Sequence, residues 1–381
     1  MRPGAIPGFL PTAAGMFLFG HFSGMAVLNG YIQSRSGLSL GTFGLVLATG
    51  ALAALAVNLL LRRSGKRYSG AFGLLLMAFA VWFPVLAQSL PALLLAYSLQ
   101  GAASRIALAG LYRAVAAVQR RSLELGGATN TTLLLESMAG FGLCESFLFN
   151  SLLTEATGHA EWAASACLML GSPVGIWLRN RLPDWTAPAK SETRVAESPN
   201  RNVSVAFFAY CAEVFTMTQA TAWSSILIRK LHLGEVTLTP LLAAGILSGT
   251  FWLVVGMVRY GVGRLDSIDL RRVVLFGSFV CVSAVVGVMT SRDNALAMLV
   301  CYAMLGAGIA CFVPFALQTV AASARAGIYA DRLALLGPVM SVGVHVITGY
   351  FAQQREFFVL AALAGTAIII LTKKNPAHKT A

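Results

Sequence analysis

Long apolar stretches follow one another along the whole chain, and their length limits what it can fold into. About 20 apolar residues in a helix cross the hydrocarbon core of a bilayer, which is about 30 Å thick. Since no water reaches the backbone there, each stretch is expected to be helical. The sequence predicts twelve spans, at residues 10–32, 39–61, 69–88, 91–118, 127–153, 160–178, 203–228, 238–258, 273–290, 295–321, 333–352 and 357–372.

The composition excludes a soluble protein. Of the 381 residues, 57% are hydrophobic and only 11% are charged, and the mean hydropathy is +0.73. A soluble domain of this composition would lack the polar residues that cover its surface. We therefore predict an all-α polytopic membrane protein with twelve transmembrane helices.

The basic residues indicate how the chain is oriented in the bilayer. A net charge of +13 would suggest nucleic-acid binding in a soluble protein. With a cytoplasmic N-terminus, however, most Lys and Arg fall in cytoplasmic connections, and the outer side holds only Arg35, Arg229, Lys230, Arg292 and Arg355. This bias follows the positive-inside rule. We expect a protein of the inner (cytoplasmic) membrane, with both termini in the cytoplasm and no nucleic-acid partner.

Motifs for metals, cofactors and catalysis are missing from the sequence. All six cysteines fall inside predicted spans without CxxC spacing, which favours small buried side chains over a metal site. No G-x-x-x-x-G-K-[ST] motif for nucleotide binding occurs. We expect no metal, no cofactor and no catalytic residue, and we expect the protein to be a monomer in the lipid bilayer.

Two repeated segments indicate two six-span halves. The one long polar segment, 179–202, is expected to be a cytoplasmic linker between halves at 1–178 and 203–381. YSLQGAA (Tyr97–Ala103) returns as YAMLGAG (Tyr302–Gly308), 205 positions later (302 minus 97). NLLLRRSGKR (Asn58–Arg67) returns as GMVRYGVGRL (Gly256–Leu265), 198 positions later (256 minus 58). Nearly equal offsets in equivalent spans indicate duplication.

The spans, the halves and one loop pattern together resemble the major facilitator superfamily. Its loop between spans two and three reads G-x-x-x-D-R-x-G-R-R, and this chain has there Asn58, Arg62, Arg63, Gly65, Lys66 and Arg67, without the leading Gly and the Asp. The copy in the second half keeps Gly256, Gly263 and Arg264, with Tyr260 at the Asp position. The resemblance implies twelve spans, a central cavity lined by spans one, four, seven and ten, and a cytoplasmic latch at this loop.

Arg105 lies in the middle of the fourth predicted span. Mid-bilayer Arg costs about 2.5–3.5 kcal/mol on insertion scales, so such residues face a bundle interior or a wet cavity. The span also resembles the L-x-x-x-R-x-x-Q-G pattern of proton-coupled family members: Leu93, Gln100 and Gly101 match, but Tyr97 takes the place of the Arg. Arg105 therefore carries the charge two turns later, and Tyr97 and Gln100 are candidates for neutral solute contacts.

Glu136, in the fifth span, is the first candidate partner of Arg105. Counted from the cytoplasmic ends of their spans, the two residues differ in depth by roughly 6 Å, within reach of two long side chains. One interpretation is a permanent ion pair that fixes helix packing. The other is an Arg whose partner exchanges with an anionic solute or a proton.

Two further ionisable residues are candidates for coupling. Glu213 in the seventh span would face the implied cavity, where a desolvated carboxyl can hold a proton near neutral pH; alternatively, a neighbouring hydroxyl keeps it neutral. His21 in the first span is a candidate for solute or proton binding, or for hydrogen-bonded packing.

These residues predict a secondary transporter, with proton-coupled efflux of a small anionic or zwitterionic metabolite as the leading function. An Arg among carboxylates suits an anion, and a siderophore-like or metallophore-like solute would fit. The first span lacks an acidic residue and the fifth lacks G-P-x-x-G-G, which argues against a cationic drug pump. Efflux rests on short loops and analogy with exporters. Proton-coupled uptake of a small organic anion, a passive channel or sensor, and a polytopic membrane enzyme are the alternatives.

Overall fold

Helices account for most of the residues that the structure describes. The computed structural model describes residues 6–64, 69–125, 130–183, 201–228, 231–233, 235–265, 269–291, 294–321, 326–351 and 365–369. Their helices follow the order of the twelve predicted spans. Among the described residues, nine helices are long and apolar enough to cross a membrane. The protein is therefore an all-α polytopic membrane protein, as the sequence predicts.

The helices before the linker form what we call the N-terminal group. It contains α1 (Phe9–Ser23), η2 (Gly24–Leu28), α2 (Asn29–Ser36), α3 (Leu40–Ser64), α4 (Gly70–Ala80), α5 (Trp82–Leu86), α6 (Leu90–Glu124), α7 (Thr131–Thr157) and α8 (Ala160–Leu178). The predicted span 10–32 is thus a bent rod made of α1, η2 and α2. Most of the predicted linker and of span 357–372 lies outside the described residues, so the domain boundaries stay predictions.

The elements after the linker form the C-terminal group. They are α9 (Arg201–Thr218), η3 (Gln219–Trp223), α10 (Ser224–Leu227), β1 (Leu231–Leu233), β2 (Val236–Leu238), α11 (Pro240–Gly263), α12 (Leu270–Thr290), α13 (Ala295–Ile309), α14 (Phe312–Ala321) and α15 (Ala326–Phe351). The short antiparallel hairpin β1–β2 in the connection before α11 is the one departure from the expected all-helical chain within the described residues.

Local sequence signals explain several helix boundaries. The side chains of Ser89 and Thr239 cap α6 and α11, and each is followed by a proline within the first two helical positions. Two helices continue beyond their predicted ends at 118 and 258, because charged residues near a helix end need not stop it. In α6 the added turn contains an Arg120–Glu124 pair at 2.8 Å, and α11 runs on to Gly263.

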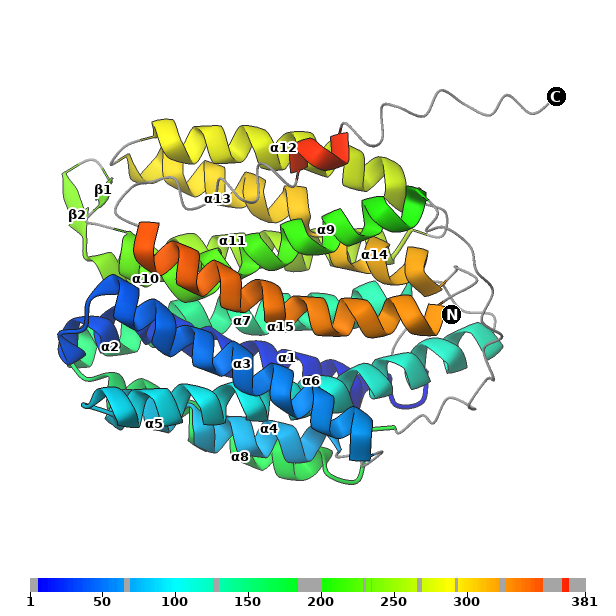
Figure 1. Cartoon of the computed structure of the whole chain (residues 1–381), viewed down its shortest axis with the longest axis horizontal. Coiled ribbons are helices and arrows are strands. Elements are labelled where there is room, and N and C mark those ends of the chain that lie inside the picture. Colours follow the sequence, from blue (N-terminus) through cyan, green and yellow to red (C-terminus); the bar gives the residue numbers. More distant parts are fainter. Residues whose placement is uncertain are drawn as a thin grey trace.

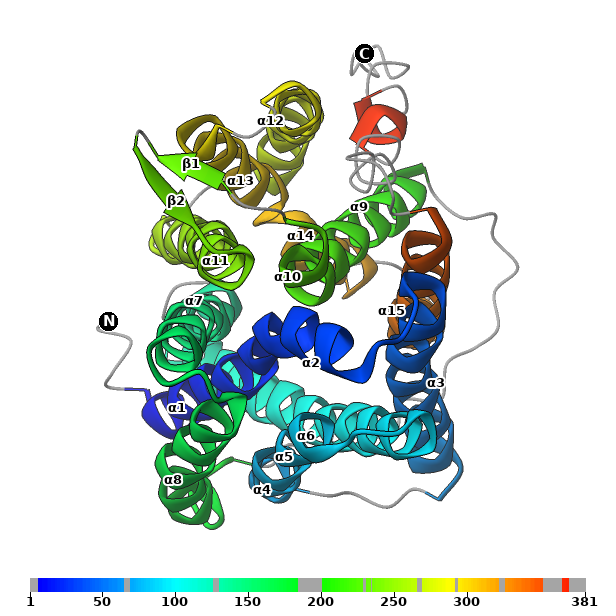
Figure 2. The same ribbon diagram turned by 90° about the vertical axis from the view of Figure 1, so that its left-hand side faces the viewer.

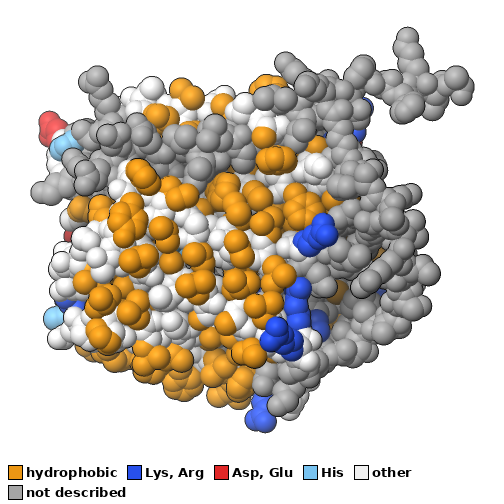
Figure 3. All heavy atoms as spheres, in the orientation of Figure 1, with side chains coloured by type: hydrophobic (Ala, Val, Ile, Leu, Met, Phe, Trp, Pro, Cys, Tyr) orange, Lys and Arg blue, Asp and Glu red, His pale blue; other side chains and the backbone are white. Residues whose placement is uncertain are grey.

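The surface of the bundle is apolar in the middle and basic at one end. Large apolar side chains such as Met169, Phe276 and Phe351 are more than two-thirds exposed, and Figure 3 shows such side chains over most of one face, with Lys and Arg gathered at one end. We call this the basic end. It is defined by Arg62, Arg63, Arg120, Arg121, Arg264, Arg271 and Arg272. An apolar belt beside a basic end fits a bilayer rather than water.

Small residues let the two groups approach closely along two seams. At the α7–α11 seam, a Cβ placed on Gly140 would lie 3.1 Å from the Cα of Gly256. At the α3–α15 seam, a Cβ on Gly44 would lie 2.6 Å from the carbonyl oxygen of His345. Figure 1 shows α3 and α15 running side by side. Close contact through glycines is the usual way helices pack in membranes.

At the end opposite the basic end, the two groups close over the centre of the bundle, where α2 meets α10 (Figure 2). Asn29 Nδ2 donates to the carbonyl oxygen of Ala222 at 3.0 Å, and the Gly30 N–H donates to Ser225 Oγ at 3.0 Å. Ala222 lies in η3, a π-helical turn, and its carbonyl oxygen accepts from the Asn29 side chain of the other group. We call these contacts the seal.

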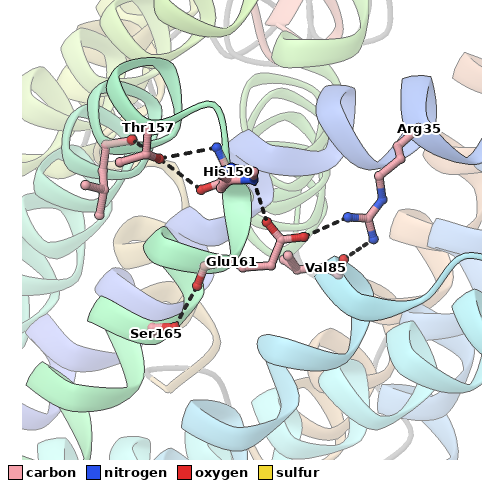
Figure 4. A network of polar contacts seen from close by, with 7 residues as sticks. Arg35, Val85, Thr157, His159, Glu161 and Ser165 are labelled. Carbon is pink, nitrogen blue, oxygen red and sulfur yellow. Dashed lines mark hydrogen bonds and ion pairs between the residues drawn. The ribbon is translucent and has the colours of Figure 1, made fainter.

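A polar network outside the seal holds α2 against its own group (Figure 4). Arg35 Nη1 lies 2.8 Å from Glu161 Oε1 at the start of α8, and Arg35 Nη2 donates to the carbonyl oxygen of Val85 at the end of α5. His159 and Thr157 complete the network. Arg35 therefore fixes the C-terminal end of α2, and the seal is built from Asn29 and Gly30 at the other end of the same helix.

The seal predicts a sharp response to one methyl group. A Cβ at Gly30 would lie 2.1 Å from the Ser225 carbonyl oxygen, so Gly30→Ala should force α2 and α10 apart. The probe is a cysteine at Met217, a cavity residue on α9 that lies on the basic-end side of the seal, in a background without other cysteines. A membrane-impermeant maleimide added on the seal side should react with Met217→Cys faster when Gly30→Ala is also present. Gly261→Ala, where a Cβ meets nothing within 4 Å, is the control. Equal rates in both variants would contradict the seal.

Candidate functional site

A cavity of about 630 Å³ lies between the two groups, on the basic-end side of the seal. As the family resemblance implies for spans one, four, seven and ten, α1, α6, α9 and α14 line it, and α7, α11 and α15 contribute further residues. Its volume falls in the range of small-molecule sites. Of the described residues, four charged ones line it: Arg105, Glu136, Glu213 and Arg259.

Arg259 is the centre of a buried cluster of charges. Its Nη2 contacts Glu213 Oε1 directly, its Nη1 lies 3.9 Å from Glu136 Oε2, and its Nε donates to the Ala310 carbonyl oxygen at 2.8 Å. We call Arg259, Glu213 and Glu136 the triad. Because all three side chains are almost completely buried, each charge depends on the others for compensation.

The two carboxylates of the triad are held differently. Glu213 Oε2 also accepts the Val313 N–H at 2.6 Å, at the start of α14. Glu136 has only a 3.4 Å contact of its Oε1 with the Tyr112 hydroxyl, and its Oε2 has no hydrogen bond. Glu213 is therefore an anchored ligand of Arg259, whereas Glu136, which reaches across from the N-terminal group, is the loosely held member.

Arg105 is paired differently from the sequence prediction, because Glu136 faces Arg259 instead. Arg105 Nη2 donates to Asn58 Oδ1 at 2.8 Å, and Asn58 Nδ2 donates to the Ala334 carbonyl oxygen at 3.0 Å. No ion pair among the described residues includes Arg105, and its Nε has no partner. Arg105 thus lines the cavity as a cation without a carboxylate partner.

The sequence analysis assigned Arg259 to a cytoplasmic connection and so missed it. Hydropathy ended the predicted span at 258, but the helix continues to Gly263 and keeps Arg259 one turn inside it. Helical periodicity was the available signal: Trp252, Gly256, Arg259 and Gly263 recur every three or four residues and are all buried. A charge on such a face indicates a buried partner.

Tyr97 and Gln100 do not line the cavity. The Tyr97 hydroxyl donates to Asn29 Oδ1 at 2.7 Å, so Tyr97 supports the residue that bonds to Ala222 in the seal. Gln100 is half-buried on α6. The geometry therefore gives Tyr97 a place in closing the bundle and provides no support for direct solute contact by either residue in this conformation.

His21 lies outside the cavity as well. Its Nδ1 is 2.5 Å from Glu145 Oε2, between α1 and α7. A pair between two neighbouring helices of one group supports the packing alternative for His21.

The loop pattern is only partly described. Arg62 and Arg63 lie at the exposed end of α3, whereas Gly65, Lys66 and Arg67 lie outside the described residues. In the second copy, Gly256 and Gly263 are inside α11, where Gly263 packs against Leu134 of α7. Arg264 stacks on Tyr260, 4.4 Å from the ring centroid. Gly256 and Gly263 thus belong to a helix seam and not to a loop, because α11 is longer than predicted.

The triad predicts a strong dependence on charge balance. Arg259→Met leaves two buried carboxylates without a cation and should destabilise the protein by about 3–5 kcal/mol. The double variant Arg259→Met/Glu213→Gln should recover part of this loss, because the buried carboxylate of Glu213 is removed along with the cation that compensated it. Apparent melting temperature in detergent measures both effects, with exposed Arg272→Met as the control. An Arg259→Met variant as stable as the control would contradict the account.

Solved structures with the same fold are transporters. The inward open conformation of the xylose transporter XylE from E. coli matches with a TM-score of 0.71 and 11% identity, covering 97% of this chain and 96% of that one. A mutant of the peptide transporter POT in complex with alafosfalin matches with a TM-score of 0.67 and 13% identity, covering 96% and 93% of the two chains. At this identity the likeness concerns the fold. No curated protein sequence matches the chain.

A family model covers most of the chain. The model described as Major Facilitator Superfamily matches residues 9–348, from the start of α1 to near the end of α15. This range includes both groups, both seams and every described residue of the cavity. The chain is therefore a member of the major facilitator superfamily of membrane transporters.

Proposed function

We propose that this protein is a proton-coupled secondary transporter of a small anionic or zwitterionic metabolite, working by alternating access. The observation that carries the proposal is the pairing pattern in the cavity: among the described residues, Arg105 has no carboxylate partner, while Arg259 has two. A cation without a partner provides a site for an anion. Two carboxylates around one guanidinium provide a site that can bind and release a proton.

The seal supports alternating access. With the basic end placed in the cytoplasm, as the positive-inside rule favours, the cavity lies on the cytoplasmic side of the seal. Transport would require the seal to open while contacts nearer the basic end close. Glu136–Arg259 and Asn58–Ala334 both join the two groups there, and so they would respond to such a rocking motion.

The charge balance and the hydrogen bonds favour Glu136 as the residue that binds and releases the proton. With both carboxylates ionised, the triad carries one negative charge more than Arg259 compensates, and one bound proton balances it. Glu136 Oε2 has no hydrogen bond that protonation would break, whereas a proton on Glu213 would disturb either its contact with Arg259 or its contact with the Val313 N–H. Glu213 then holds Arg259 in place.

The direction proposed from the sequence is efflux. The charge balance favours a second candidate, proton-coupled uptake. A proton on the triad removes a negative charge that would repel an incoming anion, so anion and proton bind best together. Cotransport of this kind would carry the solute in the direction of proton flow.

The residues of the cavity predict which variants lose coupling. In proteoliposomes with a pH gradient, accumulation from a panel of labelled sulfonates and mono-, di- and tricarboxylates should fall to the level of protein-free liposomes in Arg105→Ala. Glu136→Gln should lose accumulation driven by the gradient but retain exchange of solute for solute, because the neutral side chain mimics the protonated state. Exposed Glu124→Gln and Arg272→Ala are the controls. Full accumulation in Arg105→Ala would overturn the site.

The same liposomes distinguish efflux from uptake. If solute and protons move together, acid outside should drive solute inward, which supports uptake. If they move in opposite directions, acid outside should drive loaded solute outward, which supports efflux. Accumulation that is insensitive to the gradient in either orientation would contradict proton coupling.

A further inference from the structure

Apart from its four charged residues, the described lining of the cavity is mainly apolar. Most lining side chains are apolar or aromatic, contributed by both groups, and include Phe19, Leu108, Leu143, Met217, Trp252 and Leu317. Polar side chains are few. Methionine and aromatic side chains in such walls adapt to apolar ligands of varied shape. The larger part of any bound solute would therefore contact hydrocarbon.

Among the lining residues that the structure describes, a single cation remains for the solute. Of the two arginines among its described lining residues, Arg259 is occupied by Glu213 and Glu136, which leaves Arg105. A second anionic group on the solute would lie among apolar side chains or near the carboxylates of the triad. Burying an unpaired charge in such surroundings is strongly unfavourable.

Asn58 positions the guanidinium of Arg105. Its amide oxygen accepts from Arg105 Nη2, and its amide nitrogen donates to the Ala334 carbonyl oxygen on α15, so both ends of the amide are used. An amide orients the guanidinium without neutralising it, whereas a carboxylate would. The remaining N–H groups of Arg105, including Nε, stay available for the two oxygens of one acidic group.

From these three observations we infer that the solute is an amphiphilic organic monoanion, with one acidic group bound by Arg105 and a bulky apolar body against the cavity walls. The inference rests on the proposed function and narrows its substrate class. A solute rich in carboxylates, as a siderophore-like metabolite would be, needs several cations, and the described residues of the cavity leave only Arg105 for it.

A matched set of probes separates charge from apolar body. Naphthalene-2-sulfonate has one permanent charge and an apolar body, naphthalene-2,6-disulfonate adds a second charge, and methanesulfonate keeps the charge without the body. Binding to purified protein in lipid nanodiscs is measured by equilibrium dialysis, with empty nanodiscs subtracted. The monosulfonate should bind at least about tenfold more tightly than either other probe. Methanesulfonate lacks the apolar body that contacts the walls, and the disulfonate buries a second charge without a cation.

Variants then locate the binding. Arg105→Gln should weaken binding of naphthalene-2-sulfonate roughly tenfold or more, whereas Arg105→Lys should restore part of the affinity. Asn58→Leu should weaken binding less than Arg105→Gln, because the cation remains but is no longer oriented. Exposed Arg272→Gln is the control for loss of a cation. Identical melting profiles of Arg105→Gln and the control confirm that the variant is folded.

The outcomes separate this inference from the proposed function. Binding of the disulfonate as tight as that of the monosulfonate, or tight binding of methanesulfonate, would overturn the amphiphilic monoanion while leaving proton-coupled anion transport intact. Equal binding of naphthalene-2-sulfonate by wild type and Arg105→Gln would overturn the site itself. If di- or tricarboxylates alone are accumulated in proteoliposomes, the transport function stands and the substrate class is wrong.

Discussion

The ion pairing of Arg259 is the interaction on which the rest of the cavity depends. Out of contact with water, two carboxylates and a guanidinium must be compensated by one another. Glu213 comes from α9 and Arg259 from α11 of one group, while Glu136 comes from α7 of the other. The same contact therefore balances buried charge and joins the groups. A change in its protonation would alter both, which gives a physical route from proton binding to movement of the groups.

Besides the polar contacts around the cavity, the seams and the seal hold the groups together, and they differ in what they permit. The seams use glycines and backbone contact, as at Gly140 and Gly256, and a seam of this kind can act as a hinge. The seal uses few hydrogen bonds: Asn29 donates to the carbonyl oxygen of Ala222 in the π-helical turn η3, and the Gly30 N–H donates to the side chain of Ser225 in α10. Breaking a few hydrogen bonds costs little when partners or water replace them, so the seal is suited to opening.

The sequence was sufficient for the fold because membrane spans need only length and hydropathy. The twelve predicted spans follow the order of the helices, and the family membership agrees with the resemblance. The site was harder. The sequence identified Arg105 as a charge in the middle of a span. The predicted partner, Glu136, was wrong, since depth along a helix does not determine which way a side chain points. Arg259 was missed because the apolar run of its span ends at residue 258, whereas pairing with Glu213 allows the helix to continue.

The central claim is that binding of an anion and of a proton are linked through Arg105 and the triad. The most direct measurement is the change in bound protons when purified protein in weak buffer is saturated with naphthalene-2-sulfonate. The account predicts proton uptake by wild type, and none by a Glu136→Gln/Glu213→Gln variant that still binds the sulfonate. Saturation of wild type without any change in bound protons would contradict it.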